Sequence, residues 1–258
     1  MLSTYANYQM IVSDLDRSLG RVEKQPMVER ESAYYLENIT KAKSIEDFLG
    51  DDRLYRYAMK AAGLGDMIYA KAFMKKVLTE GIDGNDTFAN KLSDKRYRTF
   101  AETFNFARYG EVATTFERTQ KGTVDNYVRQ TLEEDAGKQN EGVRLALYFE
   151  RKADEIDSVL EILADPALSK VVRTALSIPD ATATIDLDKQ IAMIEKKFDV
   201  EDLKDPAKLA KFMQRFTSLW EINNPTSSPA SQLTALFAQP MGYGFSNDLL
   251  MTLQTLRR

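Results

Sequence analysis

The sequence predicts an all-α protein. Apolar residues recur at steps of three and four along most of the chain, strand-like alternation is scarce, and glycine and proline fall between the helical segments. The chain of 258 residues has 43% hydrophobic and 29% charged residues, with 12 Gly and 7 Pro, which is typical of a folded globular protein. We therefore expect one multihelical domain over residues 1–258.

The first expected element is a helix over residues 3–23, ending before Pro26. Its apolar side chains alternate at steps of three and four, as at the a and d positions of a heptad pattern. This seam consists of Tyr5, Tyr8, Val12, Leu15, Leu19 and Val22. It has two interpretations: a surface that pairs with another helix, or the apolar side of an amphipathic helix that lies on the core. A second helix is expected over residues 27–39, and a capping box at Ser44 should start the next one.

A Leu-x-Asp motif before a helical run occurs four times along the chain. The Asp residues are Asp51, Asp94, Asp165 and Asp205. An Asp at this position accepts hydrogen bonds from free N–H groups of the first helical turn, and its charge suits the positive end of the helix. Pro166 and Pro206 follow two of them, at a position where no donor is needed. We expect all four to be helix caps, each worth roughly 1 kcal/mol.

Residues 49–66 can be laid over residues 163–180 without a gap. This similarity predicts an internal duplication, with related helical units at about residues 44–106 and 158–216. In each unit an amphipathic helix, at residues 67–78 and 187–198, separates two capped helices.

One long helix over residues 123–156 is expected to join the units, with a length of roughly 50 Å. A linker follows at residues 223–229, and a terminal helix is expected at residues 246–257. Its apolar stripe consists of Leu249, Leu250, Leu253 and Leu256.

The residue types exclude most common catalytic machinery. The chain has no Cys and no His, which removes disulfides, Cys/His zinc sites and an imidazole base. A loop starting at Asp83 is rich in oxygen ligands, but its sixth position is Phe88, where a calcium loop requires Gly. Paired acids such as Glu133 and Glu134 are expected on solvated helix faces. We therefore predict no enzyme, no catalytic residues, no metal site and no cofactor.

The charge is balanced, with 35 basic and 39 acidic residues and a net charge of −4. Neither sign forms a long block, so nucleic acid is not an expected partner. No run of about 18 apolar residues predicts a membrane span, and the first residues do not resemble a secretory signal. The expected location is the cytoplasm, or an external structure reached without a cleaved signal peptide.

Several segments resemble a known family of bacterial, chiefly alphaproteobacterial, proteins that is classified as a domain of unknown function (family 1217) and is commonly encoded among flagellar genes. The segments are YYLENI (34–39), SIEDFL (44–49), RLYRYAMKA (53–61), AKAFMKKVL (70–78), ANKLSDKRY (89–97) and FNF (104–106). The resemblance covers most of the chain. It implies a process, flagellar motility, and brings no catalytic residues.

The resemblance and the two apolar seams together favour a non-enzymatic structural or assembly protein of the flagellum. Its contacts with protein partners, or with itself, would be made by the seam at residues 5–22 and the stripe at residues 249–256. The alternative is a cytoplasmic adaptor or export chaperone that holds an amphipathic partner helix in a groove between the two units.

Overall fold

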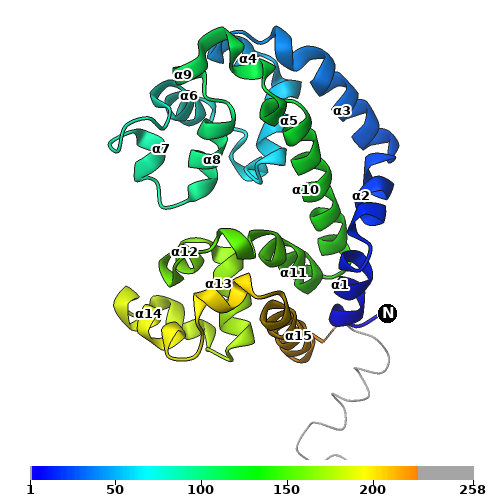
Figure 1. Ribbon diagram of the computed structural model, residues 1–258, viewed down its shortest axis with the longest axis vertical. Coiled ribbons are helices and arrows are strands. Elements are labelled where there is room, and N and C mark those ends of the chain that lie inside the picture. The colour runs from blue at the N-terminus through cyan, green and yellow to red at the C-terminus, as the bar shows by residue number, and fades with distance from the viewer. Residues whose placement is uncertain (1, 226–258) are drawn as a thin grey trace, which may run out of the picture.

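The computed structural model describes residues 2–225, and the regular structure in this range is entirely helical. The all-α prediction is therefore confirmed. Figure 1 shows two lobes, one above the other, joined by a helix in the middle and by an arm at the N-terminus. We call residues 39–119 the first lobe, residues 141–223 the second lobe, and residues 4–23 the arm.

The arm is made of two helices, α1 (Thr4–Val12) and α2 (Leu15–Glu23). The single helix expected over residues 3–23 is wrong, because α1 stops at Val12 and a new helix starts after Asp14. The Asp14 carboxylate accepts a hydrogen bond from Arg17 N–H at 3.2 Å, which caps α2. The next helix, α3 (Pro26–Asn38), lies where it was expected and begins with proline at its first position.

The first lobe contains six α-helices and four short 3₁₀ turns. The α-helices are α4 (Ile45–Gly50), α5 (Asp52–Ala61), α6 (Lys71–Glu80), α7 (Phe88–Lys91), α8 (Lys95–Thr103) and α9 (Phe106–Tyr109). The 3₁₀ turns are η1 (Ile39–Lys41), η2 (Gly65–Met67), η3 (Gly110–Thr115) and η4 (Glu117–Thr119). The capping box at the start of α4 is confirmed, with Ser44 and Asp47 bonding to each other's backbone.

The connection between the lobes is α10 (Lys121–Gln139), and the second lobe begins with α11 (Glu141–Lys152). The long helix expected over residues 123–156 is therefore wrong: it breaks at Asn140, whose backbone is extended (φ −155°, ψ 110°). The Asn140 side chain accepts a hydrogen bond from Gly142 N–H at 2.9 Å and so caps α11. Gly142 in turn lies against the Trp220 indole, a contact that fixes the new direction of the chain.

Four α-helices complete the second lobe, namely α12 (Val159–Ala164), α13 (Pro166–Ala175), α14 (Leu187–Glu195) and α15 (Pro206–Asn223). Its 3₁₀ turns are η5 (Ala153–Glu155), η6 (Asp180–Thr184) and η7 (Val200–Lys204). The four predicted Asp caps are confirmed, because each carboxylate accepts a hydrogen bond from a backbone N–H in the first turn of its helix.

Matching positions within and before the two predicted units make the same local contacts. Tyr34 Oη donates to the Asp51 carboxylate at 2.8 Å, and Tyr148 Oη donates to the Asp165 carboxylate at 2.6 Å. The turns that end α5 and α13 also agree, with positive φ at Gly63 in one and at the matching Ser177 in the other. These matches support the predicted duplication, which stays a prediction.

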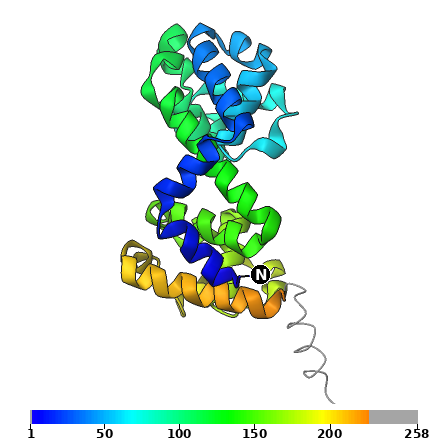
Figure 2. The ribbon, with the colours of Figure 1, turned by 90° about the vertical axis from the view of Figure 1, so that its right-hand side faces the viewer.

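The two lobes touch each other little. In residues 2–225, the polar contact that joins them directly is the ion pair between Lys95 of α8 and Glu161 of α12, at 2.6 Å. The main connections are α10, which packs on α5 and α11, and the arm, in which α2 packs on α10 while α1 packs on α11 and α15. Figure 2 shows the arm and α10 as the two connections between the lobes.

Candidate functional site

The N-terminal seam packs on the chain's own core. Tyr8 and Val22 are buried, with 3% and 4% of their surface exposed. The other four predicted contact residues are partly buried against the same core, and they are Tyr5, Val12, Leu15 and Leu19. The interpretation of the seam as the apolar side of an amphipathic region that lies on the core therefore describes this structure. Use of the seam by a partner stays a prediction.

The predicted C-terminal contact residues Leu249, Leu250, Leu253 and Leu256 lie outside the described residues, as does the predicted terminal helix. The described chain reaches Pro225, two residues after α15 ends. Both ends of the described chain lie at the same end of the molecule, beside the second lobe (Figures 1 and 2).

A polar contact joins these two ends. The N–H of Thr4, the first residue of α1, donates to Glu221 Oε2 at 3.0 Å, and its hydroxyl also contacts that oxygen. The Asn140 side chain donates to Thr4 Oγ1 at 2.9 Å. A carboxylate at the start of a helix satisfies a free N–H group and suits the positive end of the helix dipole. Glu221 of α15 therefore holds the start of α1 at the bend between α10 and α11.

A partly buried carboxyl group, that of Glu150, lies next to Tyr8 in the middle of α1. Burial raises the pKa of Glu150 on α11 above its ordinary value, against the opposing effects of the Arg129 charge and of the Tyr8 hydroxyl. Its Oε2 atom is buried without a hydrogen-bond partner. Burial next to Glu150 also raises the pKa of Tyr8. Tyr8 of α1 therefore covers a carboxyl group whose charged form is disfavoured.

Glu133 forms a second buried charged group, between α10 and α11. It is 1% exposed, so the prediction that it lies on a solvated face is wrong. Arg151 Nε and Nη2 donate to its two carboxylate oxygens at 2.7 and 2.9 Å, and Arg129 Nε donates at 3.2 Å. Two guanidinium groups thus donate three hydrogen bonds to the carboxylate, and the bonds from Arg151 tie α11 to α10.

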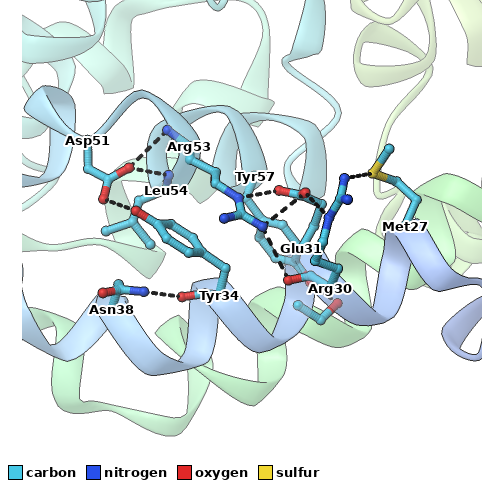
Figure 3. Close-up of polar contacts among 10 residues, drawn as sticks. Met27, Arg30, Glu31, Tyr34, Asn38, Asp51, Arg53, Leu54 and Tyr57 are labelled. Atoms are coloured by element: carbon cyan, nitrogen blue, oxygen red, sulfur yellow. Dashed lines mark hydrogen bonds and ion pairs between the residues drawn. The ribbon is translucent and has the colours of Figure 1, made fainter.

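A polar cluster joins α3 to α5 of the first lobe (Figure 3). Arg53 donates to both oxygens of Glu31, at 2.7 and 3.1 Å, and lies 3.8 Å from the centre of the Tyr34 ring. The hydrogen bond from Arg53 lowers the pKa of Glu31, and the hydrogen bond to Asp51 raises the pKa of Tyr34. Arg30 and Arg53 share the Glu31 carboxylate, and the Asp51 carboxylate accepts from the Tyr34 hydroxyl and from two backbone N–H groups. The groups of this cluster therefore bond to one another, which is the pattern of a structural cluster.

An open pocket of about 420 Å³ lies beside this cluster, between α5 and the start of α6. Its walls include Asp52, Arg56, Asp66, Tyr69 and Lys71. Lys71 is already held by the Leu49 carbonyl at 2.7 Å and by the Asp52 carboxylate. Tyr69 is strongly exposed at the rim. The residues that line the pocket include charged side chains of both signs beside Ile68 and Tyr69.

Residues 2–225 contain no cluster of acidic side chains placed to hold a metal ion. In the loop considered above, Asp83 lies near Arg108 at 3.7 Å and Asp86 near Lys91 at 3.3 Å, so both acids face cations. Across the described range, none of the helices is both long enough and apolar enough to cross a bilayer.

Comparison with known proteins places this fold in a family. Residues 61–209 match the family described as protein of unknown function, DUF1217. A protein of Agrobacterium tumefaciens, whose X-ray crystal structure was determined by a structural genomics consortium, is 52% identical in sequence. The similarity covers 87% of this chain and 98% of that one, with a TM-score of 0.79. The chain belongs to the DUF1217 family. The comparison with curated proteins finds no match.

Within this DUF1217 protein, sequence reasoning found the helix caps and the seam but missed the buried charges. Glu133, Glu150 and Glu221 each meet partners that are distant in sequence or in another helix. A weak signal exists for Glu133, since it directly follows Leu132 in the apolar stripe of α10. No local pattern marks Glu221, because its partner Thr4 lies at the opposite end of the chain.

Proposed function

We propose that this DUF1217 protein is a non-enzymatic structural or assembly protein associated with the bacterial flagellum and motility, and that it acts through helix-mediated protein–protein contacts. The flagellar role rests on the resemblance of the helical segments between residues 34 and 106 to the family encoded among flagellar genes. The mode of action rests on the arrangement of the chain ends.

The observation that carries the proposal is the meeting of α1 and α15 beside the chain ends. Leu2, just before α1, and Ile222 on α15 are 55% and 72% exposed near this contact, and Met10 is 54% exposed further along α1. The Thr4–Glu221 contact fixes these helices against each other. The chain then continues toward the segment that carries the apolar stripe of residues 249–256. Exposed apolar groups gathered in this way favour contact with another protein.

A non-enzymatic role is supported by the state of the acidic groups. Glu133 is neutralised by two arginines, and Glu150 lies under α1. The adaptor alternative needs a groove between the two units. The pocket beside α5 lies within the first unit, so it does not supply that groove.

Swimming assays test the proposal. A flagellated host that lacks the gene is complemented with the full chain, with a chain ending at residue 225, and with a chain in which Leu249, Leu250, Leu253 and Leu256 are each replaced by Ser. We expect the full chain to restore swimming and the two altered chains to fail at equal cellular abundance. Normal swimming without the gene would overturn the flagellar role, and full rescue by both altered chains would overturn the C-terminal contact.

A further inference from the structure

One side of α1 is apolar and uncharged, although it is exposed among the described residues. The opposite side of this helix is buried against α11 and α15. Leu2, Ala6 and Met10 recur at steps of four on the side that points away from them, and Leu2 and Met10 are 55% and 54% exposed. We call these three residues the outer face of α1.

The neighbouring helix shows the usual composition of a solvated face in this chain. The exposed positions of α2 are all charged, and they are Asp16, Arg17, Arg21 and Glu23. In contrast, residues 1–13 contain no charged residue, although 29% of the chain is charged. Apolar residues around the whole circumference of a helix are typical of a buried helix. The outer face of α1 therefore has the composition of a surface that another segment covers.

We propose that residues 230–237 of the same chain form a short helix that packs on the outer face of α1. This segment follows α15 after a link at residues 224–229, and it lies outside the described residues. The inference rests on the proposed function in one respect, because it concerns the same apolar surface. The segment covers this surface in the free protein, and a flagellar partner must displace it to bind there.

The sequence of the segment fits a short helix with one apolar side. Leu233, Leu236 and Phe237 recur at helical spacing. Ser228 and Pro229 precede the segment, and these residue types are typical of the cap and first position of a helix. A helix this short is marginal in water on its own, so it needs a surface on which to pack.

Charge favours this segment over the stripe at residues 249–256. Residues 222–247 contain no charged residue, like residues 1–13. An uncharged helix covers an uncharged surface without burying an unpaired charge. The stripe, in contrast, lies between Asp248 on one side and Arg257 and Arg258 on the other.

The end of α15 brings the segment close to this surface. Glu221 of α15 accepts from the N–H of Thr4, so α15 ends beside the start of α1. The chain from Pro225 to Ala230 spans up to about 17 Å when it is extended. A helix of about eight residues is about 12 Å long, and the outer face from Leu2 to Met10 has about the same length. The segment therefore reaches the outer face and matches its length.

Thiol labelling of the full-length chain tests the inference. The chain has no Cys, so Met10→Cys places one thiol on the outer face. A small maleimide should modify this thiol about tenfold more slowly than in a chain that also carries Leu233→Ser, Leu236→Ser and Phe237→Ser, a difference equivalent to about 1.4 kcal/mol of docking free energy. The slow rate should not depend on protein concentration, because the segment belongs to the same chain.

Two controls locate the effect. A Met10→Cys chain in which the four leucines of the stripe at residues 249–256 are replaced by Ser should keep the slow rate. Asn85→Cys, in an exposed loop of the first lobe, should react at the same rate with and without the three substitutions in residues 230–237. Circular dichroism checks that the variants fold.

Three results would overturn the inference. The first is an equal labelling rate of Met10→Cys with and without the three substitutions. The second is fast labelling in the chain with the altered stripe, because the stripe would then cover the outer face. The third is a slow rate that is lost on dilution, because a second copy would then supply the segment. Any of these results, with the protein still required for swimming, would leave the proposed function standing.

Discussion

A single methyl group added at Gly142 should separate α11 from α15. In the structure, a Cβ atom at this position would lie 2.3 Å from Cδ1, 2.5 Å from Nε1 and 2.7 Å from Cγ of Trp220. The indole has little freedom to move, because Trp220 is 9% exposed and packs on Phe216. Overpacking of this kind costs about 1–3 kcal/mol. Replacing Gly by Ala within a helix raises the free energy of unfolding by about 0.5–1 kcal/mol, because the unfolded chain then has less conformational freedom to lose. The overpacking cost outweighs this gain, so we expect Gly142→Ala to lower the free energy of unfolding by about 1 kcal/mol.

Urea unfolding followed by circular dichroism measures this loss. Because the chain contains one Trp, its fluorescence reports the same contact directly, and the emission of Gly142→Ala should shift as the indole is displaced. Gly20→Ala in α2 is the matched control, since a Cβ atom there meets nothing within 4 Å. That variant should be more stable by about 0.5–1 kcal/mol. A Gly142→Ala variant with the stability and emission of the wild type would refute the described packing of α15.

Three further predictions concern buried and capping carboxylates. Glu133→Gln should lower the free energy of unfolding by about 3 kcal/mol in urea titrations, because its two arginine partners keep their charges without a counter-ion; a loss below about 1 kcal/mol would show that they find other partners. Asp51→Ala should lower the free energy of unfolding by about 1–2 kcal/mol through loss of two cap hydrogen bonds. Asp165→Ala should lower it by a similar amount if the two units are equivalent, and thermal unfolding of the two variants measures both losses. The raised pKa of Glu150 means that the folded state binds its proton more tightly than the unfolded state does, so this group lowers the free energy of unfolding as pH rises from about 4.5 toward neutrality. Glu150→Gln should remove this contribution to the loss of stability with pH. If the stability of the variant depended on pH as that of the wild type does, the raised pKa of Glu150 would be contradicted.

The elements that sequence reasoning placed correctly are those whose signals are local. A capping Asp bonds to residues two and three positions ahead of it, so Asp51, Asp94 and Asp165 each mark a helix start wherever the helix packs. The positive φ at Gly63, which ends α5, follows from the same kind of short-range geometry.

The features that sequence reasoning missed depend on distant partners. Gly137 and Gly142 lie on either side of Asn140, but they do not by themselves predict the bend, because it also depends on the packing of Trp220 against Gly142. Glu133 lies in a run of acidic residues that is typical of a solvated face, and its burial depends on Arg151 of the next helix. The spacing of apolar residues predicted the seam of the arm, but this spacing does not show that the seam packs on α11 and α15.

The measurement that tests the flagellar role most directly is fractionation of the tagged protein. A small tag inserted after Asn85, in the exposed loop between α6 and α7, leaves both chain ends and the arm untouched. Purified basal bodies and hooks, together with the culture supernatant, are then compared between a flagellated host and an export-defective control. The account predicts tagged protein in the flagellar fraction of the host and its loss from that fraction in the control. Protein confined to the cytoplasm of both strains would contradict the structural role and favour the adaptor.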